Sequence, residues 1–203
     1  AIGLTGLSWT TRMMNIRVIN YSRGDSFALT EGLLYAGNNG AHIINVSLGL
    51  DSPNIMVADA IDELESQGVI IVASAGNDGL NTDFFPNYPS AYENSNIVSV
   101  AATTSSDELA SFSNYGSASV DLAAPGDSVP TTTLEASYTT VSGTSFAAPL
   151  VSATLALYKS LQPDLPHTTL IRRLLGTTDP IANLNGLVAS GGRLNAGRFI
   201  SLS

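Results

Sequence analysis

A chain of 203 residues is long enough for one domain with a sizeable core, and 44% hydrophobic against 12% charged residues indicates a globular protein. A net charge of −9 without any basic stripe argues against a nucleic-acid partner, and no apolar run reaches the roughly 18 residues of a membrane span. Cysteine is absent, which excludes disulfides, thiolate nucleophiles and cysteine-bound metals but leaves the compartment open.

The chain opens with A-I-G-L-T-G, without an initiator Met and without a basic stretch ahead of an apolar one. This pattern is not that of a signal peptide. We expect the start to be the interior of a longer chain.

The first half of the chain predicts strands that alternate with helices. Asn15–Asn20 and His42–Leu48 are β-prone, whereas the apolar spacing of Asp25–Ala36 and Pro53–Ser66 is helical. Val69–Ala73 is apolar without alternation, which is typical of a strand buried on both faces of a parallel sheet.

The second half continues the pattern after a loop rich in Asn, Asp, Gly and Pro. Strands are predicted at Ile97–Ala102 and Val120–Ala123, a buried helix at Phe146–Ser160 and an amphipathic helix at Thr168–Leu175. No repeat or low-complexity segment marks a boundary, so we expect 1–203 to be a single α/β domain with a mainly parallel sheet.

Ser145 lies between a short β-prone run, Tyr138–Val141, and the buried helix. In the first turn of a helix the backbone N–H groups lack partners and the dipole is positive, so a nucleophilic hydroxyl there has oxyanion donors beside it. An ordinary N-cap is the competing interpretation, because Ser and Thr are common caps.

Ligands of parallel α/β sheets bind at the loops that follow the carboxyl ends of the strands. Three loops have this position: Ser47-Leu48-Gly49, Ala75-Gly76-Asn77-Asp78, and the turn before Ser145.

These loops lie in segments that together resemble the subtilisin-type serine proteases. The segments are I-N-V-S-L-G at 44–49, I-V-A-S-A-G-N-D-G at 71–79 and S-G-T-S-F-A-A-P at 142–149, with further matches in order at 3–9, 87–90, 110–116 and 123–126. The resemblance runs from about Gly3 to about Leu175. It implies a three-layer fold, a mainly parallel sheet with helices on both faces, incomplete at its amino-terminal part.

The resemblance implies a nucleophile at Ser145, which would form an acyl-enzyme, and an oxyanion-hole amide at Asn77. Gly-Asn-Asp-Gly is turn chemistry by itself, so Asn77 taken without the other motifs is better explained as a turn residue. The implied substrate-binding residues are Ser47, Leu48, Gly49, Ala75, Gly76, Asp78, Asn87 and Thr144. In this set 47–49 would pair with the substrate backbone, although a sheet strand ending at a glycine explains them as well. Asp78 would favour a basic substrate residue.

The family's catalytic Asp and His motifs, Asp-Thr/Ser-Gly and His-Gly-Thr, do not occur in this sequence. His42 begins a buried strand at the end away from Ser47, and His167 begins a late helix, so neither is expected to be the base. We therefore expect a separate amino-terminal segment that carries Asp and His. Without it, the strand that bears the Asp would be missing and would leave unpaired edges and an exposed apolar face in the sheet.

The implied chemistry requires no cofactor, but the family binds structural calcium. Asp83, Asp107 and loop carbonyls near Tyr88–Tyr92 are candidates for a weak site, solvated loop acids being the simpler interpretation. The resemblance also implies a cis peptide at Tyr88-Pro89 and a secreted protein.

Two other functions remain open at this point. A protease-like domain without its triad would only bind peptides. A nucleotide-binding domain has little support, because neither G-x-G-x-x-G after a strand nor G-x-x-x-x-G-K-[ST] occurs.

Overall fold

The structure is a computed structural model that describes residues 3–20, 23–134 and 136–203. Its centre is a six-stranded sheet in which five strands run parallel and the last is antiparallel. The strand order is β3 (Ile43–Val46), β4 (Ile70–Ser74), β5 (Ile97–Thr103), β6 (Leu122–Pro125), β10 (Gly192–Arg193) and β9 (Asp179–Pro180).

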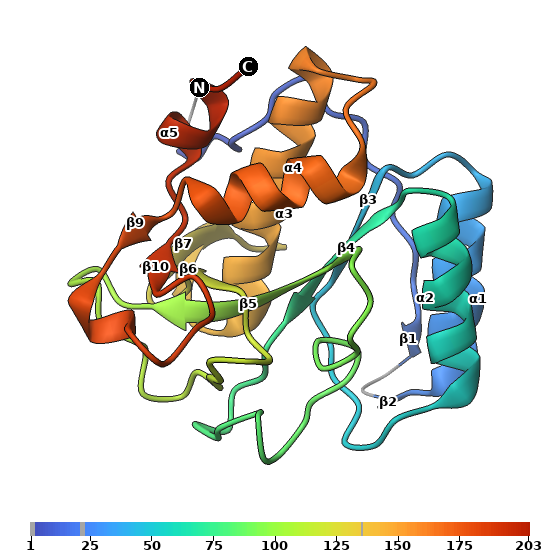
Figure 1. Cartoon of the computed structure of the whole chain (residues 1–203), viewed down its shortest axis with the longest axis horizontal. Helices are drawn as coiled ribbons and strands as arrows, with labels where there is room; N and C mark the ends of the chain where they lie inside the picture. Colours follow the sequence, from blue (N-terminus) through green and yellow to red (C-terminus); the bar gives the residue numbers. More distant parts are fainter. Residues whose placement is uncertain (1–2, 21–22, 135) are drawn as a thin grey trace.

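Helices cover both faces of this sheet (Figure 1). One face carries α1 (Ser26–Asn38) and α2 (Ile55–Ser66), and the other carries α3 (Thr144–Leu161), α4 (His167–Gly176) and α5 (Ala196–Ile200). The predicted three-layer α/β fold is thereby confirmed. None of the described helices combines the length and apolarity that crossing a membrane would require.

The layers follow from the alternation of side chains along β4 and β5. Every residue of both strands is buried. Ile70, Val72 and Val98 pack toward α3, whereas Ile71 and Ile97 pack toward α1 and α2. A strand buried on both faces needs apolar residues at every position, which explains the unbroken run from Val69 to Ala73.

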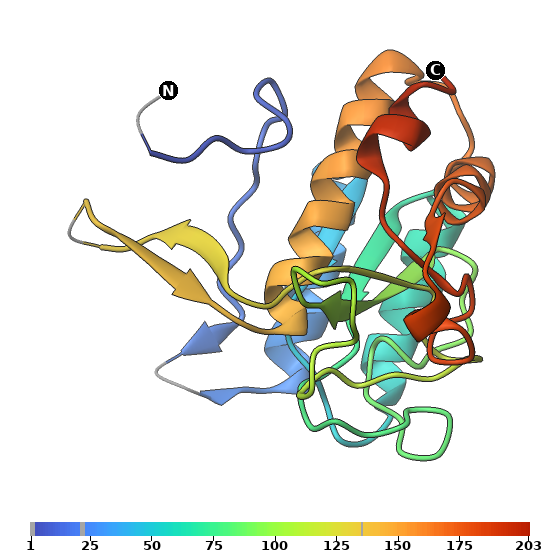
Figure 2. The same cartoon turned by 90° about the vertical axis from the view of Figure 1, so that its left-hand side faces the viewer.

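Smaller elements extend from this body. A short ribbon joins β1 (Ile19–Asn20) to β2 (Arg23–Gly24), and a hairpin joins β7 (Val129–Thr132) to β8 (Tyr138–Val141). Figure 2 shows the hairpin projecting away from the sheet. A 3-10 turn, η1 (Ala182–Leu184), precedes β10.

The predicted strand at Asn15–Asn20 is wrong for most of its length. Within it, only Ile19 and Asn20 are paired, and they pair with β2 rather than with the main sheet. The preceding residues run against α1 at Gly32, where a Cβ would lie 2.5 Å from Cγ1 of Val18. A β-branched run therefore packs on a helix here, because tertiary contacts override its strand propensity.

Within the described ranges, the sheet ends at β3, so an unpaired edge is present there as expected. β3 pairs directly with β4 in parallel, in the register Ile43↔Ile70, and the order continues unbroken to β9. Among the described residues, the outer edge of β3 has no strand beside it. Apolar side chains do stand exposed near the amino end, including Trp9 and Met13.

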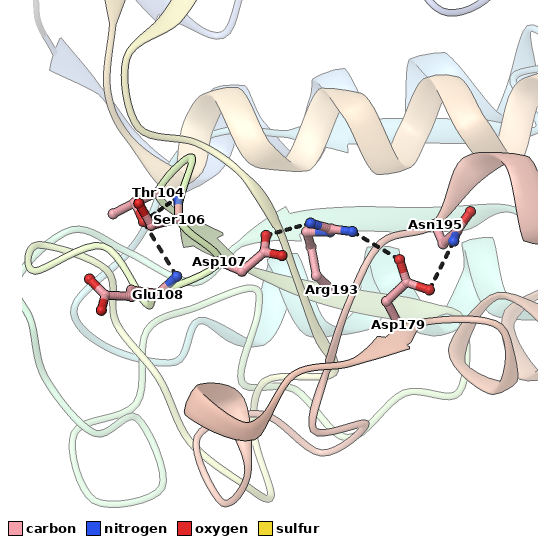
Figure 3. A network of polar contacts seen from close by, with 7 residues as sticks. All are labelled: Thr104, Ser106, Asp107, Glu108, Asp179, Arg193 and Asn195. Atoms are coloured by element: carbon pink, nitrogen blue, oxygen red, sulfur yellow. Dashed lines mark hydrogen bonds and ion pairs between the residues drawn. The ribbon is translucent and has the colours of Figure 1, made fainter.

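An ionic network holds the carboxyl-terminal strands to the sheet (Figure 3). The Arg193 guanidinium on β10 pairs with Asp107, from the loop after β5, and with Asp179 on β9 at 2.8 Å. Asn195, the N-cap of α5, donates to the second oxygen of Asp179 at 2.9 Å. The Asn195 bond, together with the Arg193 bond and charge, holds the pKa of Asp179 below its usual value.

Asp121 carries a partly buried carboxyl group directly before β6, and it accepts a hydrogen bond from the Ser99 N–H of β5 at 2.7 Å. Burial raises the pKa of Asp121 from 3.8 to about 6, against the opposing effect of that bond. The folded chain therefore holds this proton more tightly than the unfolded chain, and stability falls as pH rises from about 4 through about 6.

We expect Asp121→Asn to stabilise the protein at pH 8 by up to about 3 kcal/mol, with almost no gain at pH 4. Urea unfolding at pH 4, 6 and 8 measures this difference. Asp51→Asn, at an exposed position, is the control, and it should leave the free energy of unfolding unchanged at all three pH values. A difference that does not change with pH would contradict the assignment of a raised pKa.

Candidate active site

Ser145 lies in the first turn of α3, two residues after Gly143, whose backbone has a positive φ that favours glycine. Gly143 has φ +153° and ψ 153°, and its N–H donates to the Gly126 carbonyl at 2.8 Å. Gly143 itself is the N-cap, and it has no side chain with which to cap the helix. The Ser145 hydroxyl is thus not a cap, which removes the simpler interpretation of this serine.

Asn77, in the loop after β4, is held against the start of α3 by its side-chain oxygen. Oδ1 of Asn77 accepts from the Thr144 N–H at 2.8 Å and from the Thr144 hydroxyl at 3.0 Å. The buried Thr144 side chain also accepts from the Gly76 N–H at 3.2 Å. These contacts fix which way the amide points, so the Asn77 NH₂ group lies on the side away from Thr144.

Two hydrogen-bond donors near Ser145 remain without acceptors in the described part of the chain: the backbone N–H of Ser145 and Nδ2 of Asn77. The first is unpaired because it lies in the first turn of α3, where no preceding turn supplies a carbonyl. The second is unpaired because the bonds that Oδ1 of Asn77 accepts from Thr144 orient the exposed amide with its NH₂ group away from them. An anion placed between the two would satisfy both.

The segment after β3 reaches the same place through two contacts with Ser145. The Ser145 hydroxyl donates to the Ser47 carbonyl at 3.4 Å, and the Ser47 hydroxyl donates to the Ser145 carbonyl at 2.9 Å. Leu48 is half-buried and Gly49 is exposed beyond it. The two loops and the helix that the sequence singled out therefore meet at one edge of the sheet.

Asn87 links the segment after β3 to the carboxyl end of β4. Its Nδ2 donates to the Ser74 carbonyl at 3.3 Å, and its Oδ1 lies so close to Gly49 that a Cβ there would come within 2.3 Å. Gly49 is thus needed for close approach rather than for flexibility. Ala75 is fully buried in the core, so only its backbone faces this region.

Asn114 is a buried organiser of the site that the sequence analysis did not single out. Its Nδ2 donates to the Ala75 carbonyl at 3.0 Å, and its Oδ1 accepts from the N–H groups of Asp78 at 2.9 Å and Leu80 at 3.0 Å. It also lies where a Cβ on Gly76 would have to be, 2.2 Å from Nδ2. The sequence analysis noted the segment 110–116 only as a match to the family. The residues around Asn114 in the sequence do not show which groups its side chain contacts.

Neither histidine contacts Ser145. His42 is exposed at the amino end of β3, where its carbonyl accepts from the Ile70 N–H, while Ser145 lies beyond the carboxyl end. His167 begins α4 and lies beside Gly68, and its Nε2 is buried without a hydrogen-bond partner among the described residues. Among the described residues, the hydroxyl of Ser145 has no imidazole or carboxylate as hydrogen-bond partner.

The two acids considered for calcium are engaged with protein donors. Asp83 accepts from the N–H and hydroxyl of Ser119 at 2.9 and 2.7 Å, and Asp107 pairs with Arg193. No group of three or more acidic or histidine side chains gathers within the described ranges. Asp83 and Asp107 therefore already have protein partners for the oxygens that a calcium ion would need.

The fold and this arrangement define a three-layer α/β protein with a serine-centred site at the carboxyl edge of its sheet. A family model described as the subtilase family matches residues 1–193. The chain belongs to the subtilase family, and the predicted membership is confirmed.

Relatives and solved structures agree with this assignment. The chain is 35% identical to M-protease of Shouchella clausii over 91% of its own length and 47% of that protein, and 34% identical to subtilisin BL of Lederbergia lenta over 91% and 67%. A solved structure of proteases from Pseudoalteromonas arctica matches with a TM-score of 0.86 and 27% identity, covering 98% of this chain and 65% of that one. The chain thus spans between about half and two thirds of these proteins.

Proposed function

We propose that this chain is the serine-bearing part of a serine endopeptidase that hydrolyses peptide bonds through an acyl-enzyme on Ser145. The observation that carries the proposal is the pair of unpaired donors in the described part of the chain, Ser145 N–H and Asn77 Nδ2, beside a serine hydroxyl whose bond to the Ser47 carbonyl is long, at 3.4 Å. In attack on a peptide carbonyl, the oxygen that becomes negative would accept from both donors. Water would then release the acyl group from Ser145 and restore the hydroxyl.

The substrate would be a peptide or protein segment in extended form. Its backbone would lie along Ser47, Leu48 and Gly49, next to the outer edge of β3 and its continuation. The side chain before the scissile bond would enter the region bounded by Gly76, Asp78 and Asn87. Thr144 would act indirectly, since its contacts orient Asn77.

The proton of Ser145 requires an acceptor that neither His42 nor His167 provides. We propose that a separate amino-terminal segment supplies a His as general base and an Asp that orients it. A serine hydroxyl without such a base is a weak nucleophile, so the chain by itself should be almost inactive.

A fluorophosphonate reagent is expected to label Ser145 only when the segment with Asp and His is supplied. Mass spectrometry of peptides would place the label. Ser145→Ala should abolish it, and Ser66→Ala, at an exposed position on α2, should leave it intact. Failure to label Ser145 in the complemented protein would refute the proposal.

The second candidate function is peptide binding without hydrolysis. It is favoured by one observation, the absence of a histidine near Ser145. In that case Ser145→Ala would leave peptide affinity unchanged, and no complement would produce cleavage. The labelling experiment decides between the two functions.

Asp78 is proposed to select the substrate side chain that enters the region bounded by Gly76, Asp78 and Asn87. Its side chain is exposed, and its backbone is held by Asn114 next to Asn77. We expect Asp78→Asn to reduce the preference for Lys over Leu at that position by about threefold to tenfold, since the exposed charge acts through water. Rates of cleavage of matched Phe, Leu and Lys peptides measure this. Equal ratios in both proteins would exclude a role for the Asp78 charge.

The protein is also proposed to be secreted, on the family resemblance alone. Western detection of the tagged natural protein in medium and cell fractions tests this.

A further inference from the structure

Two phenylalanines stand largely exposed in the loop between β4 and β5. Phe84 and Phe85 keep 76% and 63% of their accessible surface, and Leu80 of the same loop keeps 42%. These three residues are called the Phe84–Phe85 rim. Several large apolar side chains left exposed in one loop indicate an interaction surface.

The backbone just before the two phenylalanines is firmly held. Thr82 is buried, and its N–H and hydroxyl both donate to the Tyr115 carbonyl, at 2.7 and 3.0 Å. Asp83 accepts from the N–H groups of Ala118 and Ser119 and from the Ser119 hydroxyl. Burial alone would raise the pKa of Asp83, but these bonds outweigh it and lower the pKa.

The backbone just after them is held as well, and by the candidate site itself. Tyr88 and Leu50 exchange two backbone hydrogen bonds, at 2.7 and 3.0 Å. The Asn87 amide binds the Ser74 carbonyl and lies against Gly49. The loop thus leaves the site at Asp78 and returns to it at Asn87, and its aromatic side chains lie on a short segment between two fixed points.

The loop also lies at the same end of the sheet as Ser145. Figures 1 and 2 both show the loops that follow β4 gathered at the end of the sheet where α3 begins. Leu50 directly continues the segment Ser47–Gly49, along which the substrate backbone is proposed to lie. A peptide that follows this segment would pass the point where Tyr88 joins the loop.

We propose that the Phe84–Phe85 rim is a subsite for a large apolar side chain, preferably aromatic, of the same extended peptide. The inference rests on the proposed function, because it adds a second contact beside the pocket at Gly76 and Asn87. The held backbone means that little conformational freedom is lost on binding, and aromatic pairs add attraction beyond burial alone. The substrate class is therefore a peptide with an apolar residue a fixed number of positions from the residue in the pocket.

Peptide affinity tests the subsite without depending on catalysis. The full chain with Ser145→Ala would be titrated with heptapeptides that carry Lys at one fixed position and a single Phe moved through the others, with Ser elsewhere. We expect one Phe position to raise affinity about fivefold to tenfold over Ser. In Phe84→Ser/Phe85→Ser this gain should vanish, while affinity for the peptide without Phe stays the same.

Tyr35→Ser is the matched control. Tyr35 is 57% exposed near the carboxyl end of α1, so it undergoes the same loss of an exposed aromatic side chain away from the site. It should keep the full gain. The single variants Phe84→Ser and Phe85→Ser should each lose part of it, which keeps the test valid should the double variant not fold.

Three results would overturn the inference. A gain from Phe that persists in the double variant removes the rim as its cause. A dimer in sedimentation that the double variant abolishes, with peptide affinity unchanged, makes the rim a contact between two copies instead. Binding of no peptide at all overturns the subsite and the proposed function together, whereas binding that ignores Phe overturns the subsite alone.

Discussion

Replacing Asn77 with aspartate is expected to slow acylation of Ser145 by about 10²–10³-fold in the complemented protein, the size found for one such donor in a subtilisin. Aspartate keeps an oxygen that can accept from the Thr144 N–H and hydroxyl, at 2.8 and 3.0 Å in the native chain, so the turn should survive. What it lacks is the NH₂ donor. The rate of labelling by fluorophosphonate measures the effect.

Peptide affinity separates loss of the donor from loss of the fold. It should change little in Asn77→Asp, because the donor matters only once the carbonyl oxygen becomes negative. Asn77→Ala removes donor and acceptor together and should be at least as slow, with a lower unfolding midpoint in addition. An Asn77→Asp variant that acylates at the native rate would exclude Asn77 from the oxyanion hole.

Phe199→Ala is expected to lower the free energy of unfolding by about 3–5 kcal/mol. Phe199 on α5 is fully buried and stacks on Tyr158 of α3, with ring centroids 4.4 Å apart. Truncation would leave a cavity against a ring that also bonds the Leu202 carbonyl through its hydroxyl. Urea unfolding followed by circular dichroism measures the change.

The same substitution at an exposed phenylalanine is the control. Phe27 on α1 is 61% exposed, so Phe27→Ala should fall within about 0.5 kcal/mol of the native protein. Equal midpoints for Phe199→Ala and the native chain would mean that α5 does not contribute to the core.

Most of the regular structure could be predicted from local pattern. The helices at α2, α3 and α4 and the strands at β4 and β5 begin and end within about two residues of their predicted bounds. In these elements apolar residues either repeat at helical spacing over several turns or form an unbroken run. Each pattern is compatible with burial in only one kind of regular structure. The two-residue strands β9 and β10 and the helix α5 carry no such pattern, and they depend on partners such as Asp107.

In the candidate site as well, some residues could be predicted from the sequence and others could not. Motifs placed Ser145, Asn77 and the segment 47–49 after strand ends, where parallel sheets put their ligands. Asn114 escaped notice because its role consists of contacts with Ala75, Asp78 and Leu80, more than 30 residues away in the chain.

The sequence by itself therefore determined the layered fold, the family, and the position of Ser145, the proposed nucleophile, at the start of a buried helix, since each depends on local composition and order. Only the tertiary structure decided that β3 pairs with β4 and that residues before Ile19 pack on α1. It also decided that Thr144 binds the side-chain oxygen of Asn77 and leaves the NH₂ group available as a donor. The physical reason is that these features are choices among long-range partners: Asn77 and Thr144 are separated by 67 positions, and nothing local states which atoms will meet.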